Sequence, residues 1–175
     1  MGKTEQPAIP KIILDAGPII HLDEIKCLHL LLDFRKLLVP DAVWEEAERY
    51  RPDIFKNCNI PFEKIVFTEN KSAYISELCN AFNLDAGETH AISLCIMNPD
   101  SIFLTDDAAA RLAAKSIGIR AYGTIGVLLR AIRKEQLKPD EVIKKLEDIP
   151  LKSTLFIRKK LLQETIEIIR KEYSL

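Results

Sequence analysis

Short apolar runs alternate with helical segments along the first two thirds of the chain, and this alternation restricts the fold more than any other feature. The expected strands, rich in β-branched and other apolar residues, are 11–15, 36–40, 63–68, 101–105 and 119–122. Because strands that alternate with helices are joined by crossover connections, they form a parallel sheet. We therefore expect an α/β fold.

The helices are predicted from periodicity and from capping residues. The apolar stretch 19–34 is expected to be helical with a break near Lys26, and Asp41 is expected to N-cap the next helix. Gly118 is expected to be the C-cap of the alanine-rich helix 108–117. The other expected helices are 72–82, 85–97, 124–133, 140–148 and 154–173. The last third of the chain is therefore helical and must pack against the sheet or against a partner.

The length of 175 residues suits one domain with a helical extension, and 47% hydrophobic residues can form a sizeable core. The four cysteines show no CxxC spacing and are expected to be reduced core residues: Cys27, Cys58, Cys79 and Cys95. The apolar runs are much shorter than a membrane span, and the N-terminus lacks the apolar core of a signal peptide. We therefore expect a cytoplasmic protein with no membrane association.

The net charge of −1 provides no overall field that would attract a polyanion. The charge is nevertheless divided along the chain, because the residues from Thr124 onward include 12 Lys or Arg and 8 Asp or Glu, whereas the first 123 are net acidic. A charged helix such as the one around 156–162 is most often a solvated face. Any site for a polyanion must therefore be local.

Acidic residues follow two of the expected strands at their carboxyl ends. Asp15 follows the first strand, and Asp106 and Asp107 follow the fourth. Ligands of open parallel sheets bind beyond the carboxyl ends of the strands, so these carboxylates meet at one edge if the two strands are neighbours. Like charges at close range raise one another's pKa unless a cation lies among them. Ligands that are all oxygen suit Mg²⁺ or Mn²⁺ rather than zinc.

Each acidic candidate also has a structural interpretation. Glu88 stands three residues after Asp85 and can complete a capping box at the start of a helix. Glu46, in the helix after the second strand, can be a surface residue, and one of Asp106 and Asp107 must N-cap the alanine-rich helix. The acid after the first strand is the hardest to explain in this way, because a carboxylate at the end of a buried strand needs compensation.

Other catalytic patterns are absent from the sequence, which has no GxxxxGK[ST], GxGxxG or GxSxG motif. Asp15-Ala-Gly lacks the second aspartate of haloacid-dehalogenase phosphatases. The third expected strand lacks the aspartate that a receiver domain phosphorylates. The histidines His21, His29 and His90 have no mutual spacing and are expected to be core or rim residues rather than ligands.

The chain resembles the PIN domain family in five motifs that occur in order. They read Lys11-Ile-Ile-Leu-Asp15, Val39-Pro-Asp-Ala-Val-Trp-Glu-Glu46, Leu84-Asp-Ala-Gly-Glu88-Thr-His-Ala-Ile, Phe103-Leu-Thr-Asp-Asp-Ala-Ala-Ala-Arg111 and Gly123-Thr-Ile-Gly-Val-Leu-Leu129. The resemblance implies a three-layer α/β/α fold around a central parallel sheet of order 3-2-1-4-5, plus C-terminal helices. It divides the chain into an N-terminal tail (1–10), a PIN-like nuclease domain (11–135) and a C-terminal helical extension (136–175) packed on the same domain or on a partner.

The resemblance also implies the site. Asp15, Glu46 and Glu88 match the first three acids of the family, and the fourth falls on Asp106 or Asp107. Asp15, Glu88 and one member of the doublet would hold Mg²⁺ or Mn²⁺, while Glu46 would orient water or help to bind a second ion. The resemblance thus implies catalytic chemistry from residues on three different parts of the chain.

Two neighbouring positions carry further expectations. Arg111 could face a substrate phosphate or form an ion pair with one of the acids. Relatives often have a small hydroxyl residue directly after the first acid, where this chain has Ala16-Gly17, so a hydrogen bond of the site is expected to be missing.

The activity implied by the resemblance is a metal-dependent endoribonuclease that cleaves single-stranded or looped RNA. The resemblance is closest to the prokaryotic branch of the family, and only that branch favours RNA over DNA, because no residue of the sequence reads a 2′-hydroxyl. A role as the toxin of a toxin–antitoxin pair, with an antitoxin protein as partner, is a further implication. The alternative is a non-catalytic nucleic-acid or protein-binding module that keeps the fold.

Self-association as a homodimer is expected from the helical parts. The stretch 19–34 and the tail from Thr154 carry more apolar residues than one core-facing stripe requires, and a two-fold pairing is the commonest closed assembly. The alternative is a monomer in which the tail folds back over its own sheet.

Overall fold

The computed structural model describes residues 10–67 and 73–174. Its five strands form one parallel sheet in the order β3-β2-β1-β4-β5, which confirms the predicted topology. The strands are β1 (Ile12–Leu14), β2 (Leu37–Pro40), β3 (Phe62–Ile65), β4 (Ile102–Leu104) and β5 (Arg120–Tyr122). The central strand β1 lies between β2 and β4. The first and fourth strands are therefore neighbours, which is the condition under which the acids that follow them meet at one edge.

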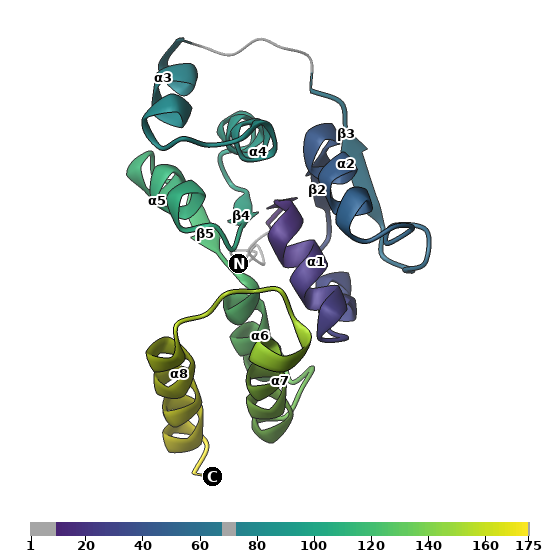
Figure 1. The fold of residues 1–175 in the computed structure, drawn as a ribbon, viewed down its shortest axis with the longest axis vertical. Coiled ribbons are helices and arrows are strands. Elements are labelled where there is room, and N and C mark those ends of the chain that lie inside the picture. The colour runs from purple at the N-terminus through teal and green to yellow at the C-terminus, as the bar shows by residue number, and fades with distance from the viewer. Residues whose placement is uncertain (1–9, 68–72, 175) are drawn as a thin grey trace, which may run out of the picture.

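Helices cover both faces of this sheet and so form three layers with it. The helices α6, α7 and α8 lie together at the end opposite to α3 (Figure 1). They are α1 (Ala16–Glu24), η1, a 3₁₀ helix (Leu28–Asp33), α2 (Asp41–Tyr50), α3 (Ala73–Ala81), α4 (Ala86–Met97), α5 (Ala108–Ser116), α6 (Thr124–Arg133), α7 (Pro139–Lys152) and α8 (Lys159–Glu172).

The alternation of side chains along each strand divides the core in two. Ile12 and Leu14 belong to the larger cluster, with residues of α1, η1, α2, α6, α7 and α8. Ile13 points to the smaller cluster on the other face, where it packs with Phe103 and with residues of α4 and α5. Both faces of the sheet are therefore covered, as a parallel sheet requires.

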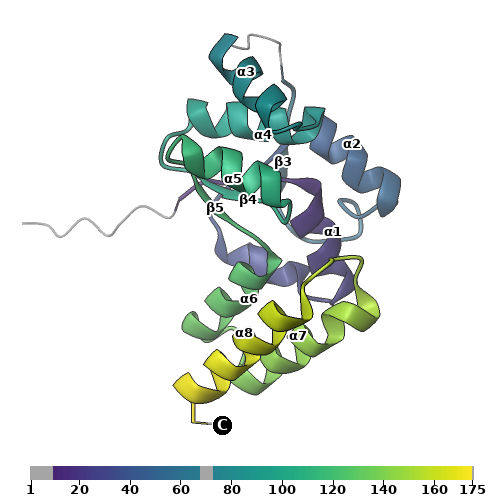
Figure 2. The ribbon, with the colours of Figure 1, turned by 60° about the vertical axis from the view of Figure 1, so that its left-hand side comes forward.

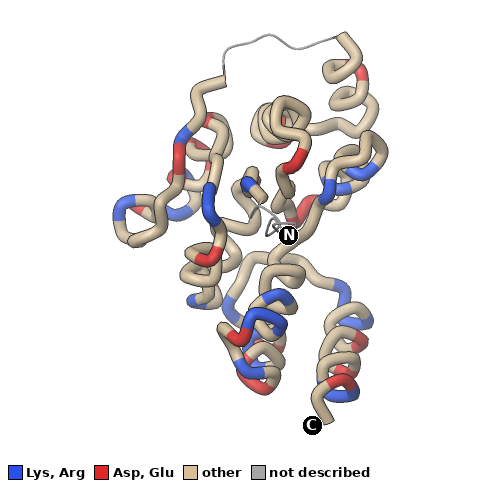
Figure 3. The backbone as a smooth tube through the Cα atoms, turned by 180° about the vertical axis from the view of Figure 1, so that it is seen from behind, with Lys and Arg blue, Asp and Glu red and all other residues tan. Residues whose placement is uncertain are grey.

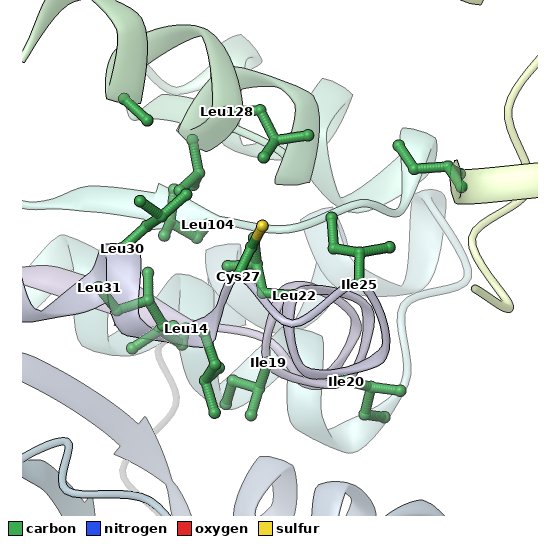
Figure 4. Close-up of a cluster of buried hydrophobic side chains, with 14 of the residues drawn as sticks. Leu14, Ile19, Ile20, Leu22, Ile25, Cys27, Leu30, Leu31, Leu104 and Leu128 are labelled. Atoms are coloured by element: carbon green, nitrogen blue, oxygen red, sulfur yellow. The ribbon is translucent and has the colours of Figure 1, made fainter. Parts of the chain in front are cut away.

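The larger cluster includes most of the apolar residues that led us to expect a dimer. Leu22, Leu30 and Leu31 face Leu14 and Leu128 in this core (Figure 4). The tail from Thr154 contributes to the same cluster through Leu162, Ile166 and Ile169 of α8, whereas Leu32, Phe156 and Leu161 remain exposed. The C-terminal helices thus pack on their own domain.

Residues 153–158, which we call the strap, join α7 to α8 in an extended conformation (Figure 2). The helix predicted from residue 154 therefore begins later, at Lys159. The reason is a carboxylate from another element. Glu24, at the end of α1, accepts hydrogen bonds from the Ser153 hydroxyl and the Thr154 amide, both at 2.7 Å, and these bonds hold the strap out of helical geometry.

Other boundaries differ by a few residues from the prediction. Pro40, not Asp41, is the N-cap of α2, and Asp41 accepts a hydrogen bond only from the adjacent Ala42 amide. Ile117 is the C-cap of α5, and Gly118 follows it with a φ of +79°. The predicted break near Lys26 is confirmed, because this residue has a φ of +58°.

Some predicted positions lie outside the described residues, namely most of the N-terminal tail, Thr68 and Ser72. The four cysteines are free, as predicted, and only Cys58 is not fully buried. In the described part of the chain, no helix is both long and apolar enough to cross a membrane.

Two phenylalanines should differ sharply in their contribution to stability. Phe103 is fully buried between the sheet and its helices, whereas Phe156 on the strap is 87% exposed. Phe103→Ala is expected to lower the free energy of unfolding by about 3–5 kcal/mol, and Phe156→Ala should change it by no more than about 0.5 kcal/mol. Urea denaturation measures both, and a large loss in the Phe156 variant would contradict the packing described.

Candidate metal centre

An acidic cavity of about 450 Å³ opens where β1 and β4 end. It is lined by all five acids predicted from the sequence and by one more acid: Asp15, Glu46, Glu88, Asp106, Asp107 and Asp85. The sequence had assigned Asp85 only to a helix cap. Gly17, His21, Ala108, Leu155 and Phe156 complete the lining. The fold therefore gathers at one point acids that lie up to 92 residues apart in sequence.

Asp15 is the most deeply buried of these acids. One carboxylate oxygen accepts a hydrogen bond from the Ala16 amide, and the other accepts one from the Thr105 hydroxyl, both at 2.8 Å. Burial raises the pKa of Asp15 to about 7, and the nearby charges of Glu46 and Asp85 act in the same direction. The Thr105 hydroxyl, at the end of the neighbouring strand, thus holds the Asp15 carboxylate.

Glu88 forms the predicted capping box and also lies in the cavity. It forms a capping box with Asp85 at the start of α4, in which each side chain accepts from the other residue's amide at 3.0 and 2.8 Å. It also lines the cavity, where burial raises its pKa to about 7 and the charges of Asp85, Asp15 and Asp107 add to the effect. The cap therefore positions the carboxylate without removing it from the site.

Glu46 faces the cavity from α2. Burial raises its pKa, and the charge of Asp85 raises it further. A Cβ atom at Gly87 would lie 3.1 Å from a methyl group of Val43 and 3.5 Å from a Glu46 carboxylate oxygen. The glycine thus lets the first turn of α4 approach α2 closely, which brings Glu46 to the cavity.

Asp106 is held by several hydrogen bonds. Its two carboxylate oxygens accept from the Thr124 amide at 2.7 Å and from the Thr124 hydroxyl at 2.6 Å, and His21 Nδ1 lies 2.8 Å from the second oxygen. A Cβ at Gly123 would lie 2.5 Å from an Asp106 oxygen, so only glycine permits this approach. Asp106 therefore binds the N-terminus of α6. Its contact with His21 was not predicted from the sequence.

Asp107 is the N-cap of α5, which confirms that one member of the doublet has this role. Its carboxylate accepts a hydrogen bond from the Ala110 amide at 2.8 Å. Its own amide donates to the Thr105 hydroxyl at 3.1 Å. The charge of Asp107 also raises the pKa of Glu88, so this carboxylate acts on the cavity as well as on the helix.

Arg111 lies beside the acids but does not neutralise them. Its guanidinium donates to the backbone carbonyl of Asp106 at 2.9 Å, and among the described residues it forms no ion pair with a carboxylate. Its Nε–H is buried without a hydrogen-bond partner in the described structure. The predicted ion pair is therefore not found, and the phosphate contact stays a prediction.

The donor set fits the chemistry of Mg²⁺ or Mn²⁺, because the acids that line the cavity offer only oxygen. Repulsion among buried carboxylates is the condition that a divalent cation relieves. Within residues 10–67 and 73–174, however, no three acidic, histidine or cysteine side chains are grouped closely enough to hold an ion. The cavity therefore supplies the ligand types, and the side-chain arrangement described is not that of a formed metal site.

Comparison with known families agrees with this geometry. A family model described as DUF3368, a PIN domain, matches residues 11–171. The chain belongs to the PIN domain family. The match extends beyond residue 135 and includes α7 and most of α8. A search of curated proteins found no match. The PIN domain is a nuclease-type fold, and in this chain the cavity brings together the five acids predicted from the sequence.

The raised pKa values predict how the stability of the metal-free PIN domain depends on pH. Asp15 and Glu88 have folded-state pKa values of about 7, above their ordinary values of 3.8 and 4.5. Between these limits the folded state holds more protons than the unfolded state. The contribution of these groups to the free energy of unfolding is therefore complete below about pH 4 and is lost as the pH rises to about 7.

The difference between wild type and Asp15→Asn isolates one of the two groups. Relative to the variant, the wild type should become less stable from about pH 4 to about pH 7, by at most about 1.4 kcal/mol per pH unit. Urea denaturation in EDTA at several pH values measures this difference. A difference that does not vary with pH would contradict the raised pKa of Asp15.

The aspartate doublet predicts two unequal losses of stability. Asp107→Ala removes a helix N-cap and should cost about 0.5–2 kcal/mol. Asp106→Ala leaves the amide and hydroxyl of the fully buried Thr124 without partners and should cost about 1–3 kcal/mol for each group. Asp100→Ala, in an exposed turn, is the control. Equal losses in thermal or urea denaturation for the two doublet variants would refute the distinct roles assigned to them.

Proposed function

We propose that this PIN domain is an Mg²⁺- or Mn²⁺-dependent endoribonuclease that cleaves single-stranded or looped RNA. The observation that carries the proposal is the convergence of five family acids on one cavity, with the pKa values of Asp15 and Glu88 raised to about 7. Clusters of titratable groups with perturbed pKa values in a cavity are typical of functional sites. A purely structural role would not require the five acids to face the same space.

The metal would be held by Asp15, Glu88 and one member of the aspartate doublet. We favour Asp107 for the third ligand, because its charge acts on Glu88, whereas both oxygens of Asp106 accept hydrogen bonds from Thr124. When bound, the ion would lower the pKa of water and neutralise charge on the scissile phosphate.

The protein's own groups prepare the cavity for this chemistry. The Thr105 hydroxyl and the Ala16 amide hold the Asp15 carboxylate in one orientation, and the capping box holds Glu88. Glu46 faces both from α2 and would orient the attacking water or help to bind a second ion. Fixed carboxylates reduce the rearrangement needed when substrate arrives.

The narrower biological role follows from the family resemblance alone. As a toxin ribonuclease, this protein would have an antitoxin protein as partner, and a short reading frame beside its gene would support that role. A homodimer also stays a prediction. Most of the apolar residues that suggested the dimer pack inside the domain. Light scattering would measure whether the protein is a monomer or a dimer.

The rival function is a binding module that keeps the fold without catalysis. One observation favours it: Asp15, Glu88, Asp106 and Asp107 each accept hydrogen bonds that stabilise a helix start. Binding of RNA without cleavage in Mg²⁺ or Mn²⁺ would support this rival.

A cleavage assay tests the proposed activity. Purified protein should cleave single-stranded RNA with Mn²⁺ or Mg²⁺, and EDTA should stop the reaction. Asp15→Asn and Glu46→Gln are expected to lower the rate by about 100-fold or more. Glu45→Gln is the matched control, because Glu45 is the exposed neighbour on the same helix and does not line the cavity. Full activity in Asp15→Asn, or activity that persists in EDTA, would disprove the proposed site.

A further inference from the structure

A larger cavity of about 1100 Å³ adjoins the acidic one. We call it the side groove. It lies between α5, β5 and α6 on one side and the strap and α8 on the other, and it shares Asp106, Ala108, Leu155 and Phe156 with the acidic cavity. The two cavities therefore adjoin along these residues, and a ligand in the side groove lies next to Asp106.

The side groove carries four basic side chains from three elements, namely Arg111 and Lys115 of α5, Arg120 of β5 and Arg158 of the strap. Among the described residues none of them pairs with a carboxylate side chain. Among the described residues that line the groove, the one acid is Asp106, whose oxygens already accept hydrogen bonds. Further basic residues gather at the start of α8, beside the strap (Figure 3). The side groove thus has a local excess of positive charge in a nearly neutral protein.

Arg111 lines the side groove next to Asp106, which lies at the junction of the two cavities. It follows the acidic doublet by one helical turn, and its guanidinium already donates to the Asp106 carbonyl. Its Nε–H is buried without a partner in the described structure.

Phe156 stands at the same junction and is 87% exposed. Its exposure is imposed by the strap. The neighbouring Leu155 and Ile157 pack against the larger core cluster, and Glu24 fixes the start of the strap. In an extended chain alternate side chains point in opposite directions, so Phe156 is held away from the core, in the lining of both cavities. Tyr122, which is half-exposed, is a second aromatic residue in the lining of the side groove.

We propose that the side groove binds single-stranded RNA, with its phosphates on the four basic residues and an unpaired base stacked on Phe156 beside the acidic cavity. The inference rests on the proposed function and adds to it the path of the substrate. A positive groove with exposed aromatic rings is the arrangement by which proteins bind single strands, because every unpaired base presents a flat face.

The test separates binding from cleavage by working in EDTA. Fluorescence anisotropy with a labelled RNA of about 12 nucleotides should show binding to wild type. Phe156→Ala should weaken it by roughly 5- to 150-fold, and Phe156→Trp should retain it. Leu151→Ala is the matched control, because Leu151 is an apolar residue near the strap that is 81% exposed and lies outside both cavities.

The salt dependence tests the basic residues. If all four contact phosphates, the slope of log affinity against log salt should be near −2.8, and Arg158→Ala should reduce its magnitude by about 0.7. An unchanged slope in that variant would show that Arg158 does not contact an RNA phosphate. RNA duplex that binds as tightly as the single strand, or DNA that binds more tightly than RNA, would overturn the assignment.

The outcomes distinguish this inference from the proposed function. If the protein cleaves RNA but Phe156→Ala binds as wild type, the inference fails and the nuclease remains. If binding depends on Phe156 but Mn²⁺ yields no cleavage, the groove stands and the nuclease proposal fails. If Phe156→Ala converts a dimer to a monomer without changing RNA affinity, the side groove is a self-association surface and the inference is wrong.

Discussion

The rest of the structure depends on how negative charge is accommodated where the central strand β1 ends. Asp15 is buried there, and its carboxylate is compensated by the Ala16 amide at the start of α1 and by Thr105 after β4. The same solution recurs around the cavity. Asp85, Asp107 and Asp106 accept from amides at the starts of α4, α5 and α6. Helix N-termini carry partial positive charge, so four of them can stabilise an acidic cluster.

This arrangement explains why the structural and catalytic interpretations of the acids are compatible. Each hydrogen bond to a helix start fixes a carboxylate, and burial with mutual repulsion still leaves the pKa values of Asp15 and Glu88 well above normal. The helix ends thus hold the acids together at a residual electrostatic cost. Relief of that cost by a cation or by protons is what connects the stability of the domain to its proposed chemistry.

The C-terminal third belongs to the same unit. The first residue of α6, Thr124, is bound to Asp106, and α7 and α8 share the larger core with β1. Glu24 of α1 holds the strap beside the acidic cavity. The strap is the one segment here whose sequence indicates a helix but whose backbone is extended. A distant carboxylate that binds Ser153 and Thr154 outweighs a local helical preference, which is weak without a packed face.

The sequence by itself determined the parallel α/β fold and the acids at the ends of the first and fourth strands, which follow from local periodicity and from the rule that parallel strands end at one edge. The resemblance of its motifs to the PIN family added the strand order and the two glutamates, Glu46 and Glu88. Tertiary structure alone decided the donors and neighbours of each acid: Thr105 for Asp15, Thr124 and His21 for Asp106, and the place of Asp85 in the cavity. Such contacts join residues up to 90 positions apart, and no local pattern encodes the packing that brings them within hydrogen-bond distance.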